Sequence, residues 1–447
     1  MTLRQGSREH HQAMTPGVDY IPEPLVRRLS VIGLWLLIIN GMIAAGIFGL
    51  PAEAARLAGG FSPWVFAISA ALISPIILCF AQLGSYFTAT GGPVLYAGKA
   101  FGPIVGFQAG WCLYVARLLA FAANVNLLVN SLPYFLGGAI GSGLRLPLLF
   151  ATCSLLTVLN VVGIRAAIHS LSVLTVLKFL PLIALVSFGL WKLHWNLRLQ
   201  IPTDPHDLGA AVLLVVYAYT GFESGLVVAG EARHPQRDLP RALLAALFLC
   251  SALYVLIQAV SIAALPTLAL STRPLVDVAA ALMGPSGALL LTAGLITSVG
   301  ANLVGSMFSS PRITYSLALE AHLPHWFGTV HPTYKTPVWS VVFFGTACFS
   351  LAASSGFAWL AGLSVLTRLL LYLVCIGAIP RLKSQFGTAP AALRLPGGYL
   401  VPALAVAVCI GLLTQVKALA FVSAAGLLAV GSLLYVAAQW SSRDHPL

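Results

Sequence analysis

Long apolar stretches recur along nearly the whole chain, and short polar segments separate them. Each stretch has about 20 residues, the length that a helix needs to cross about 30 Å of hydrocarbon. Inside lipid the backbone must pair with itself, so such stretches fold as helices. The pattern predicts about twelve spans, at residues 31–56, 63–88, 101–130, 146–163, 168–191, 208–231, 241–265, 286–317, 337–354, 357–379, 398–416 and 418–439.

The composition agrees with an all-α polytopic membrane protein whose main partner is the lipid bilayer. Hydrophobic residues make up 59% of the chain and charged residues 8%, whereas a soluble domain carries about a quarter charged residues. The net charge of +12 is spread over short loops, which does not favour a nucleic-acid partner. The seven cysteines lie in apolar stretches without metal-ligand spacing. We therefore expect no metal and no cofactor.

The distribution of basic residues predicts the orientation in the membrane. An even number of spans places both termini on one side, and the loops on that side carry most of the lysine and arginine residues. Basic loops face the cytoplasm. We expect a multi-pass protein of the inner or plasma membrane with both termini in the cytoplasm. Residues 1–28 lack the apolar core of a signal peptide, which predicts a cytoplasmic tail.

Two of the predicted spans contain helix-breaking residues near their middles. Residues 41–51 include three glycines and Pro51, and residues 217–225 include Gly221 and Gly225. Interrupted spans at corresponding places in two halves of a chain indicate an inverted-repeat transporter with its site at the midplane. The start of the outer half of the first span would offer N–H groups to an anion, and the end of the outer half of the sixth would offer carbonyls to an ammonium group. A zwitterionic amino acid matches both.

Four charged residues lie deep inside the predicted spans: Arg117, Lys178, Glu223 and Arg368. A charge at mid-bilayer costs at least about 2.5 kcal/mol, so it normally faces the bundle interior or a cavity. We hypothesise that Arg117 pairs with Glu223 or meets an acidic or polar substrate group. Glu223 is either a proton-linked gate or, as we favour, a permanently ionised partner of Arg117 or Lys178. The excess of cations disfavours a polyamine substrate, and Arg368 has no assigned role.

Several motifs resemble the amino acid–polyamine–organocation superfamily of permeases, from the first span to at least the tenth. Residues 43–48 resemble the glycine motif of its first helix, and residues 91–111 resemble the segment between its second and third helices. Residues 217–223 with 229–241 are the most specific match, and residues 312–324 also fit. The resemblance implies a secondary active transporter that moves amino acids by alternating access, independent of sodium and either by exchange or by proton coupling.

The resemblance also implies a fold. It is a LeuT-like arrangement of two inverted repeats, residues 29–195 with helices 1–5 and residues 207–380 with helices 6–10, in which helices 1 and 6 are broken. Residues 398–439 would form two peripheral helices. The oligomeric state stays open.

The same resemblance implies roles for individual residues. The expected substrate-binding residues are Met42, Ala44, Ala45, Gly46, Arg117, Tyr217, Ala218, Thr220 and Gly221. Tyr217 matches an aromatic gate, and Glu223 and Lys178 are the other candidates for gating or coupling. Lys178 resembles the lysine that stands at the sodium position in sodium-independent relatives, although Ser298 and Asn302 keep sodium coupling open. Ala44 replaces a usual glycine, which narrows the pocket and is strained if the position needs a positive φ.

Other functions compete with an amino acid carrier. A permease for another small organic solute, such as an organic acid or amine, is the main alternative, and a transporter-like sensor is a weaker one. A membrane enzyme is disfavoured because the chain has no HExxH, GxSxG or P-loop motif.

Overall fold

The computed structural model describes residues 29–132, 142–162, 175, 177–192, 204–387, 393–395 and 397–444. These residues are almost entirely helical, and their only β pairing is one isolated bridge between Leu29 and Ala232. The expected cytoplasmic tail, residues 1–28, lies outside the described residues, as do residues 168–174 of the fifth predicted span.

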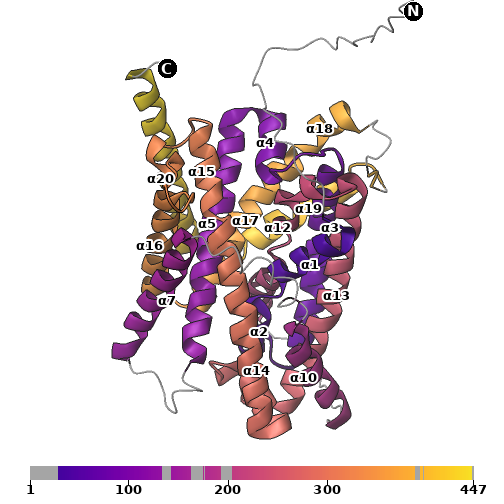
Figure 1. Cartoon of the computed structure of the whole chain (residues 1–447). Coiled ribbons are helices and arrows are strands. Elements are labelled where there is room, and N and C mark those ends of the chain that lie inside the picture. Colours follow the sequence, from indigo (N-terminus) through magenta and orange to yellow (C-terminus); the bar gives the residue numbers. More distant parts are fainter. Residues whose placement is uncertain are drawn as a thin grey trace, which may run out of the picture.

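The first half of the described chain forms helices α1 (Val31–Met42), α2 (Ala45–Ala58), α3 (Ser62–Ser85), α4 (Pro93–Phe101), α5 (Pro103–Ser131), α7 (Ser142–Val162) and α10 (Phe179–Lys192). The second half forms α11 (Pro205–Val216), the 3-10 turn η2 (Tyr217–Tyr219), α12 (Glu223–Val227), α13 (Pro235–Ala264), α14 (Pro274–Ser309), α15 (Pro311–Leu319), α16 (Val338–Ser354), α17 (Phe357–Gly377), α18 (Ile379–Phe386), α19 (Leu400–Leu413) and α20 (Ala418–Asp444). Figure 1 shows them as one elongated bundle.

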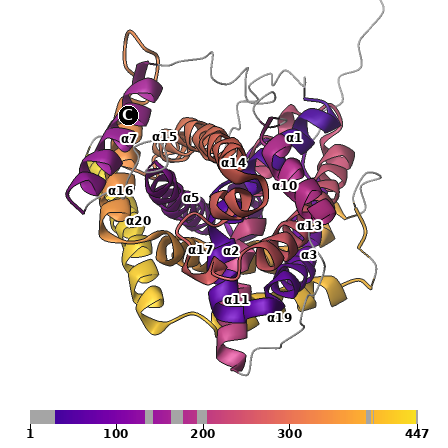
Figure 2. The ribbon, with the colours of Figure 1, turned by 90° about the horizontal axis from the view of Figure 1, so that it is seen from below.

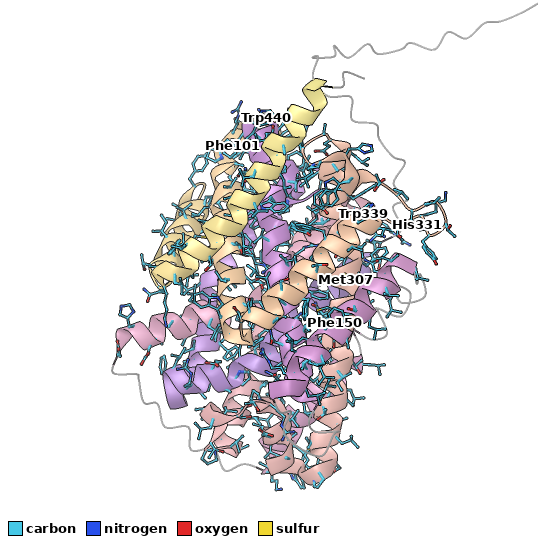
Figure 3. All side chains as sticks on the ribbon, turned by 90° about the vertical axis from the view of Figure 1, so that its left-hand side faces the viewer. Phe101, Phe150, Met307, His331, Trp339 and Trp440 are labelled. Atoms are coloured by element: carbon cyan, nitrogen blue, oxygen red, sulfur yellow. The ribbon has the colours of Figure 1, made fainter. Side chains whose placement is uncertain are left out.

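The bundle presents the surface of a membrane protein. Among the described residues, seven helical stretches are long and apolar enough to cross a membrane, and five shorter apolar helices accompany them. Large apolar side chains lie exposed on α7, α16 and α20, where Phe150, Trp339 and Trp440 are 58%, 57% and 68% exposed (Figure 3). Such a surface is stable against lipid rather than water. The number of crossings, about twelve, stays a prediction.

The contacts between helices define two groups, seen from below in Figure 2, and α14 packs against helices of both. In one group α13 packs against α1 and α3, while α11 packs against α2 and α3. In the other group α5, α7, α14 and α16 pack against one another. Helix α17 packs along α5. This arrangement leaves room for a cavity between the groups at the level where the first group is interrupted.

Both predicted interruptions are present. The first apolar segment divides into α1 and α2 at Ile43 and Ala44. The second divides where η2 ends and α12 begins, through Thr220, Gly221 and Phe222. Gly221 has a φ of 100°, a conformation that glycine adopts readily and other residues avoid. The structure therefore brings non-helical backbone into the middle of two apolar segments.

The eighth predicted span differs from the structure at both of its ends. Helix α14 begins at Pro274, bends at Gly284, whose φ is 70°, and ends at Ser309. The prediction of 286–317 missed the first turns because Gly284 and Pro285 read as a boundary. It ran past the true end because Pro311, which has no N–H to donate, starts the separate helix α15.

Candidate functional site

A cavity of about 810 Å³ lies between the two helix groups, which is within the usual range for a small-molecule site. Its closed end is lined by polar residues of α1, α5, η2 and α14: Asn40, Asn124, Tyr217 and Asn302. Its other end is lined by Arg312 of α15 and by Tyr334 and Lys335. Because Tyr334 is 44% exposed, the cavity opens there, at the end of the bundle where α4, α15 and α18 lie (Figure 1).

The carboxyl end of α1 is held by a buried lysine. The Lys178 ammonium, just before α10, is fully buried and donates to the Asn40 side-chain oxygen at 2.7 Å, the Ile43 carbonyl at 2.8 Å and the Asn40 carbonyl at 3.4 Å. These contacts account for all three of its N–H donors. The positive charge also lies at the end of a helix that carries a partial negative charge. Lys178 thus completes the first interruption.

Other donors complete the same helix end. The Met42 carbonyl accepts from the Tyr254 hydroxyl at 3.0 Å and from the Ala44 N–H at 3.0 Å. The Ile43 carbonyl accepts a second bond, from Ser298 at 3.3 Å. The protein therefore satisfies the last carbonyls of α1 with its own groups.

The amino end of α12 is held by its own first residue, Glu223. One Glu223 carboxylate oxygen accepts from the Gly221 N–H at 2.7 Å. The other accepts from the Arg368 guanidinium at 3.0 Å and from the Tyr372 hydroxyl. The side chains of Glu223 and Arg368 are 2% and 5% exposed. Arg368 also donates to the Ala116 carbonyl at 3.3 Å and to Ser364, so the ion pair joins α12, α17 and α5.

This geometry corrects the predicted pairing of Glu223. The hypothesis of a partner in Arg117 or Lys178 is wrong, because the ion-pair partner is Arg368, which had no assigned role. Helix α17 runs beside α5 and carries Arg368 to the start of α12, whereas Lys178 binds the end of α1. Glu223 is buried and ion-paired, but with a residue that the prediction did not name.

A chain of hydrogen bonds crosses the closed end of the cavity, away from its mouth. The Asn302 amide donates to the Asn40 carbonyl at 3.3 Å, and the Asn124 amide donates to Asn302 at 2.8 Å. The Tyr217 hydroxyl donates to Asn124 at 3.1 Å. The Tyr217 ring packs edge-on against Phe357, with 6.1 Å between the ring centroids. Phe357 begins α17, so this contact closes the side of the cavity away from its mouth.

The two interrupted segments cross in direct backbone contact. A Cβ atom added at Gly221 would meet the Gly41 carbonyl, with its carbon at 2.6 Å. A Cβ atom added at Gly46 would lie 2.9 Å from the Cα of Ala218. Real Cβ atoms do not approach so closely, so these glycines are required by packing. Gly46 consequently has a structural role whether or not its N–H group binds a ligand.

Arg117 faces the cavity from α5. Its single hydrogen bond among the described residues is to the hydroxyl of Ser309, at 3.3 Å. Because Asn124 bonds Asn302 in the same way, α5 and α14 run antiparallel with two polar contacts seven residues apart on each helix. Arg117 therefore lies about 10 Å along α5 from Asn124, on the side of the mouth.

The predicted site residues divide by their position. Those that line the cavity are Met42, Ala44, Gly46, Arg117, Tyr217, Thr220, Gly221 and Glu223. Ala45, Ala218 and Lys178 are buried behind its surface. Ala44 has a φ of −129°, so the strain expected of a positive φ does not arise.

The sequence reasoning missed several residues that build this region. Asn40, Asn124, Tyr254 and Tyr372 carry its hydrogen bonds and received no role. The signal was available for the two asparagines, since amide side chains inside apolar helices normally bond to neighbouring helices.

The comparison with protein families decides what kind of protein has this cavity. The family model for amino acid permeases matches residues 29–440, which is most of the chain. The chain belongs to the amino acid permease family. It is accordingly a multi-pass membrane transporter of the amino acid–polyamine–organocation superfamily, as the motifs predicted.

Relatives with assigned substrates match nearly the full length of this permease. The serine/threonine exchanger SteT of Bacillus subtilis is 26% identical over 86% of this chain and 89% of its own. The methylthioribose transporter of the same organism is 25% identical over 95% of each chain. The branched-chain amino acid permease BcaP, also from Bacillus subtilis, is 24% identical over 92% of each chain. Their substrates differ from one another, so the likeness supports transport of a small molecule without naming it.

Proposed function

We propose that this permease is a secondary active carrier of amino acids and that the cavity is its substrate site. The observation that supports the proposal is that charged side chains of the protein occupy only two of the four helix ends at the interruptions. Four helix ends meet at the two interruptions, and protein side chains of opposite charge occupy two of them, Lys178 at the end of α1 and Glu223 at the start of α12. The other two ends, the start of α2 and the end of η2, line the cavity through Gly46 and Thr220.

These two remaining ends suit a zwitterion. The first N–H groups of α2 have no acceptor within their own helix, and a helix start favours a carboxylate. The carbonyls at the end of η2, of which Ala218 and Thr220 have no donor among the described residues, suit an ammonium group. The Met42 carbonyl, expected to share this role, already has two donors. We therefore assign the ammonium group mainly to the backbone after Tyr217.

The proposed mechanism is alternating access in a LeuT-like fold. The repeats would be residues 29–195 and 207–380, and the helix group of α1, α2, α11 and α12 would move against the group of α5 and α14. With the termini in the cytoplasm, the mouth at α15 makes the present conformation open to the inside. In this inward-open conformation, Tyr217 and Phe357 form the closed outer gate.

We also propose that transport is independent of sodium. Lys178 already brings a positive charge to the Asn40 and Ile43 carbonyls, where a bound cation would compete with the ammonium group. Uptake into proteoliposomes should then be equal in sodium and choline buffers. Stimulation by sodium would contradict this part of the mechanism and leave the substrate class standing.

A ligand panel tests the substrate class without any mutation. A ligand that binds only the folded protein raises its melting temperature. We expect amino acids to stabilise the purified permease, and we expect their amides and N-acetyl derivatives, which lack the carboxylate or the ammonium charge, to lose that effect. Retention of stabilisation by both derivatives would refute the assignment of the two helix ends.

A carrier of another small organic solute is the second candidate. The methylthioribose transporter, whose likeness covers 95% of this chain, favours it. Stabilisation by an organic acid, amine or thiosugar, with none by any amino acid, would replace the proposed substrate class with this one.

A further inference from the structure

Arg117 is a deep cation of the cavity lining that, among the described residues, forms no hydrogen bond or ion pair with a carboxylate. Both oxygens of Glu223 are occupied, one by the Gly221 N–H and the other by Arg368 and Tyr372. Glu223 forms its ion pair with Arg368 and not with Arg117. The only bonded partner of Arg117 among the described residues is the neutral Ser309 hydroxyl.

The rest of the lining strengthens this imbalance. Two further cations, Arg312 and Lys335, line the cavity towards its mouth, and one further carboxylate, Glu231, does so. The Arg312 guanidinium is held over the Phe308 ring, 3.4 Å from its centroid. A cavity lined mainly by charges of one sign concentrates ligands of the opposite sign. The lining is thus net positive from the mouth to Arg117.

We propose that Arg117 binds a second anionic group of the substrate, so that the preferred substrate is a small solute with two carboxylates, such as an acidic amino acid. This inference rests on the proposed function, because the first carboxylate is assigned to the start of α2. A substrate lying against Tyr217 and Asn124 extends towards the mouth, where Arg117 stands about 10 Å along α5. A guanidinium offers a carboxylate two parallel N–H donors, which fixes both charge and orientation.

A comparison of glutamate with glutamine measures the effect of the second carboxylate alone, since the two molecules have nearly the same size and differ in one anionic group. We expect the permease in proteoliposomes to bind glutamate about 10- to 100-fold more tightly than glutamine, as competition against a labelled substrate would measure, because a charge-assisted hydrogen bond is worth more than a neutral one. The Arg117→Gln variant should abolish this ratio, because it replaces the cation with a neutral amide. Arg117→Lys should retain part of the ratio.

Arg145 provides the matched control. It lies on α7 and donates to Asn126 of α5 at 2.7 Å, so Arg145→Gln also removes an arginine contact to α5, but outside the cavity lining. This variant should keep the glutamate preference. Melting temperatures of both variants separate a loss of folding from a loss of binding, and a folded Arg117→Gln carrier that keeps the glutamate preference would overturn the proposal.

Two further comparisons complete the test. One distinguishes dicarboxylates in general from acidic amino acids, and the other distinguishes failure of the Arg117 proposal from failure of the proposed function. Tight binding of succinate, equal to that of glutamate, would assign the site to dicarboxylates in general, whereas weak binding would assign it to acidic amino acids. Binding of neutral amino acids with no glutamate preference would refute the role of Arg117 and leave the proposed function intact. Binding of dicarboxylates without any amino acid would refute the proposed amino acid site and leave the role of Arg117 intact.

Discussion

The two helix interruptions solve the same problem with opposite charges. At the first, the end of α1 presents carbonyls, and a lysine from another segment meets them. At the second, the carboxylate of Glu223, the first residue of α12, accepts from the N–H of Gly221, two residues before the helix. The carboxylate is then compensated by Arg368, whereas Lys178 has only neutral acceptors. At each break, therefore, a protein side chain compensates one of the two helix ends, and that end needs no ligand.

The difference teaches where each break is vulnerable. The second break depends on a buried ion pair between three helices, so its loss leaves an uncompensated charge. The first break depends on a cation that shares two of its three acceptors, the Asn40 and Ile43 carbonyls, with other donors. We therefore expect damage at the second break to cost more stability than damage at the first.

The largest effect should follow from removal of one partner of the ion pair. Arg368→Met leaves the Glu223 carboxylate buried without its cation, which typically destabilises a protein by about 3–5 kcal/mol. Thermal unfolding of the detergent-purified variant measures the loss as a large drop in melting temperature. The double variant Glu223→Gln with Arg368→Met removes both charges and should recover most of it. A single variant as stable as the double variant would show that the pair does not stabilise the second break.

The glycine crossing should give the next largest effect. Gly221→Ala forces a positive φ on alanine, which costs about 1–2 kcal/mol, and presses its Cβ against Gly41, which costs about 1–3 kcal/mol more. We expect lower stability and little transport. Gly362→Ala on α17 is the control, because its Cβ would meet no atom within 4 Å. Equal behaviour of the two variants would mean that the segments do not need this close contact.

The lysine at the first break should matter less for stability than for transport. Lys178→Met removes the only donor to the Asn40 side-chain oxygen among the described residues, and one unpaired buried acceptor costs about 1–3 kcal/mol. The Asn40 and Ile43 carbonyls keep their bonds from Asn302 and Ser298. Uptake should fall strongly, because the end of α1 loses its fixed position. Lys192→Met tests specificity, since this lysine at the end of α10 also donates to a carbonyl, that of Leu282, but outside the cavity lining.

The contrast between the two breaks also separates what the sequence predicts from what only the fold determines. Glycines and a proline inside apolar stretches predict both interruptions, although only the second falls on a glycine, Gly221, and the first falls on Ile43 and Ala44 beside the glycines. The partner of Glu223 was not predictable from spacing, since Arg368 is 145 residues away and only the packing of α17 beside α5 brings it close. For the same reason, the sequence identified Arg117 as an unusual residue but could not show that Glu223 pairs with Arg368 instead of Arg117.

The smallest effect should come from the Tyr217 hydroxyl, which lies at the second break on the end left open for a substrate. Tyr217→Phe keeps the ring against Phe357 but removes the 3.1 Å bond to Asn124. A single neutral hydrogen bond contributes about 0.5–1.5 kcal/mol, so the variant should lose about that much stability, as thermal unfolding would measure, and transport should change little. Tyr217→Ala, which also removes the ring, should slow transport far more. If Phe and Ala at this position behaved alike in uptake assays, the hydroxyl rather than the ring would form the gate, and the hydrogen-bond chain from Lys178 to Tyr217 would join the two breaks functionally.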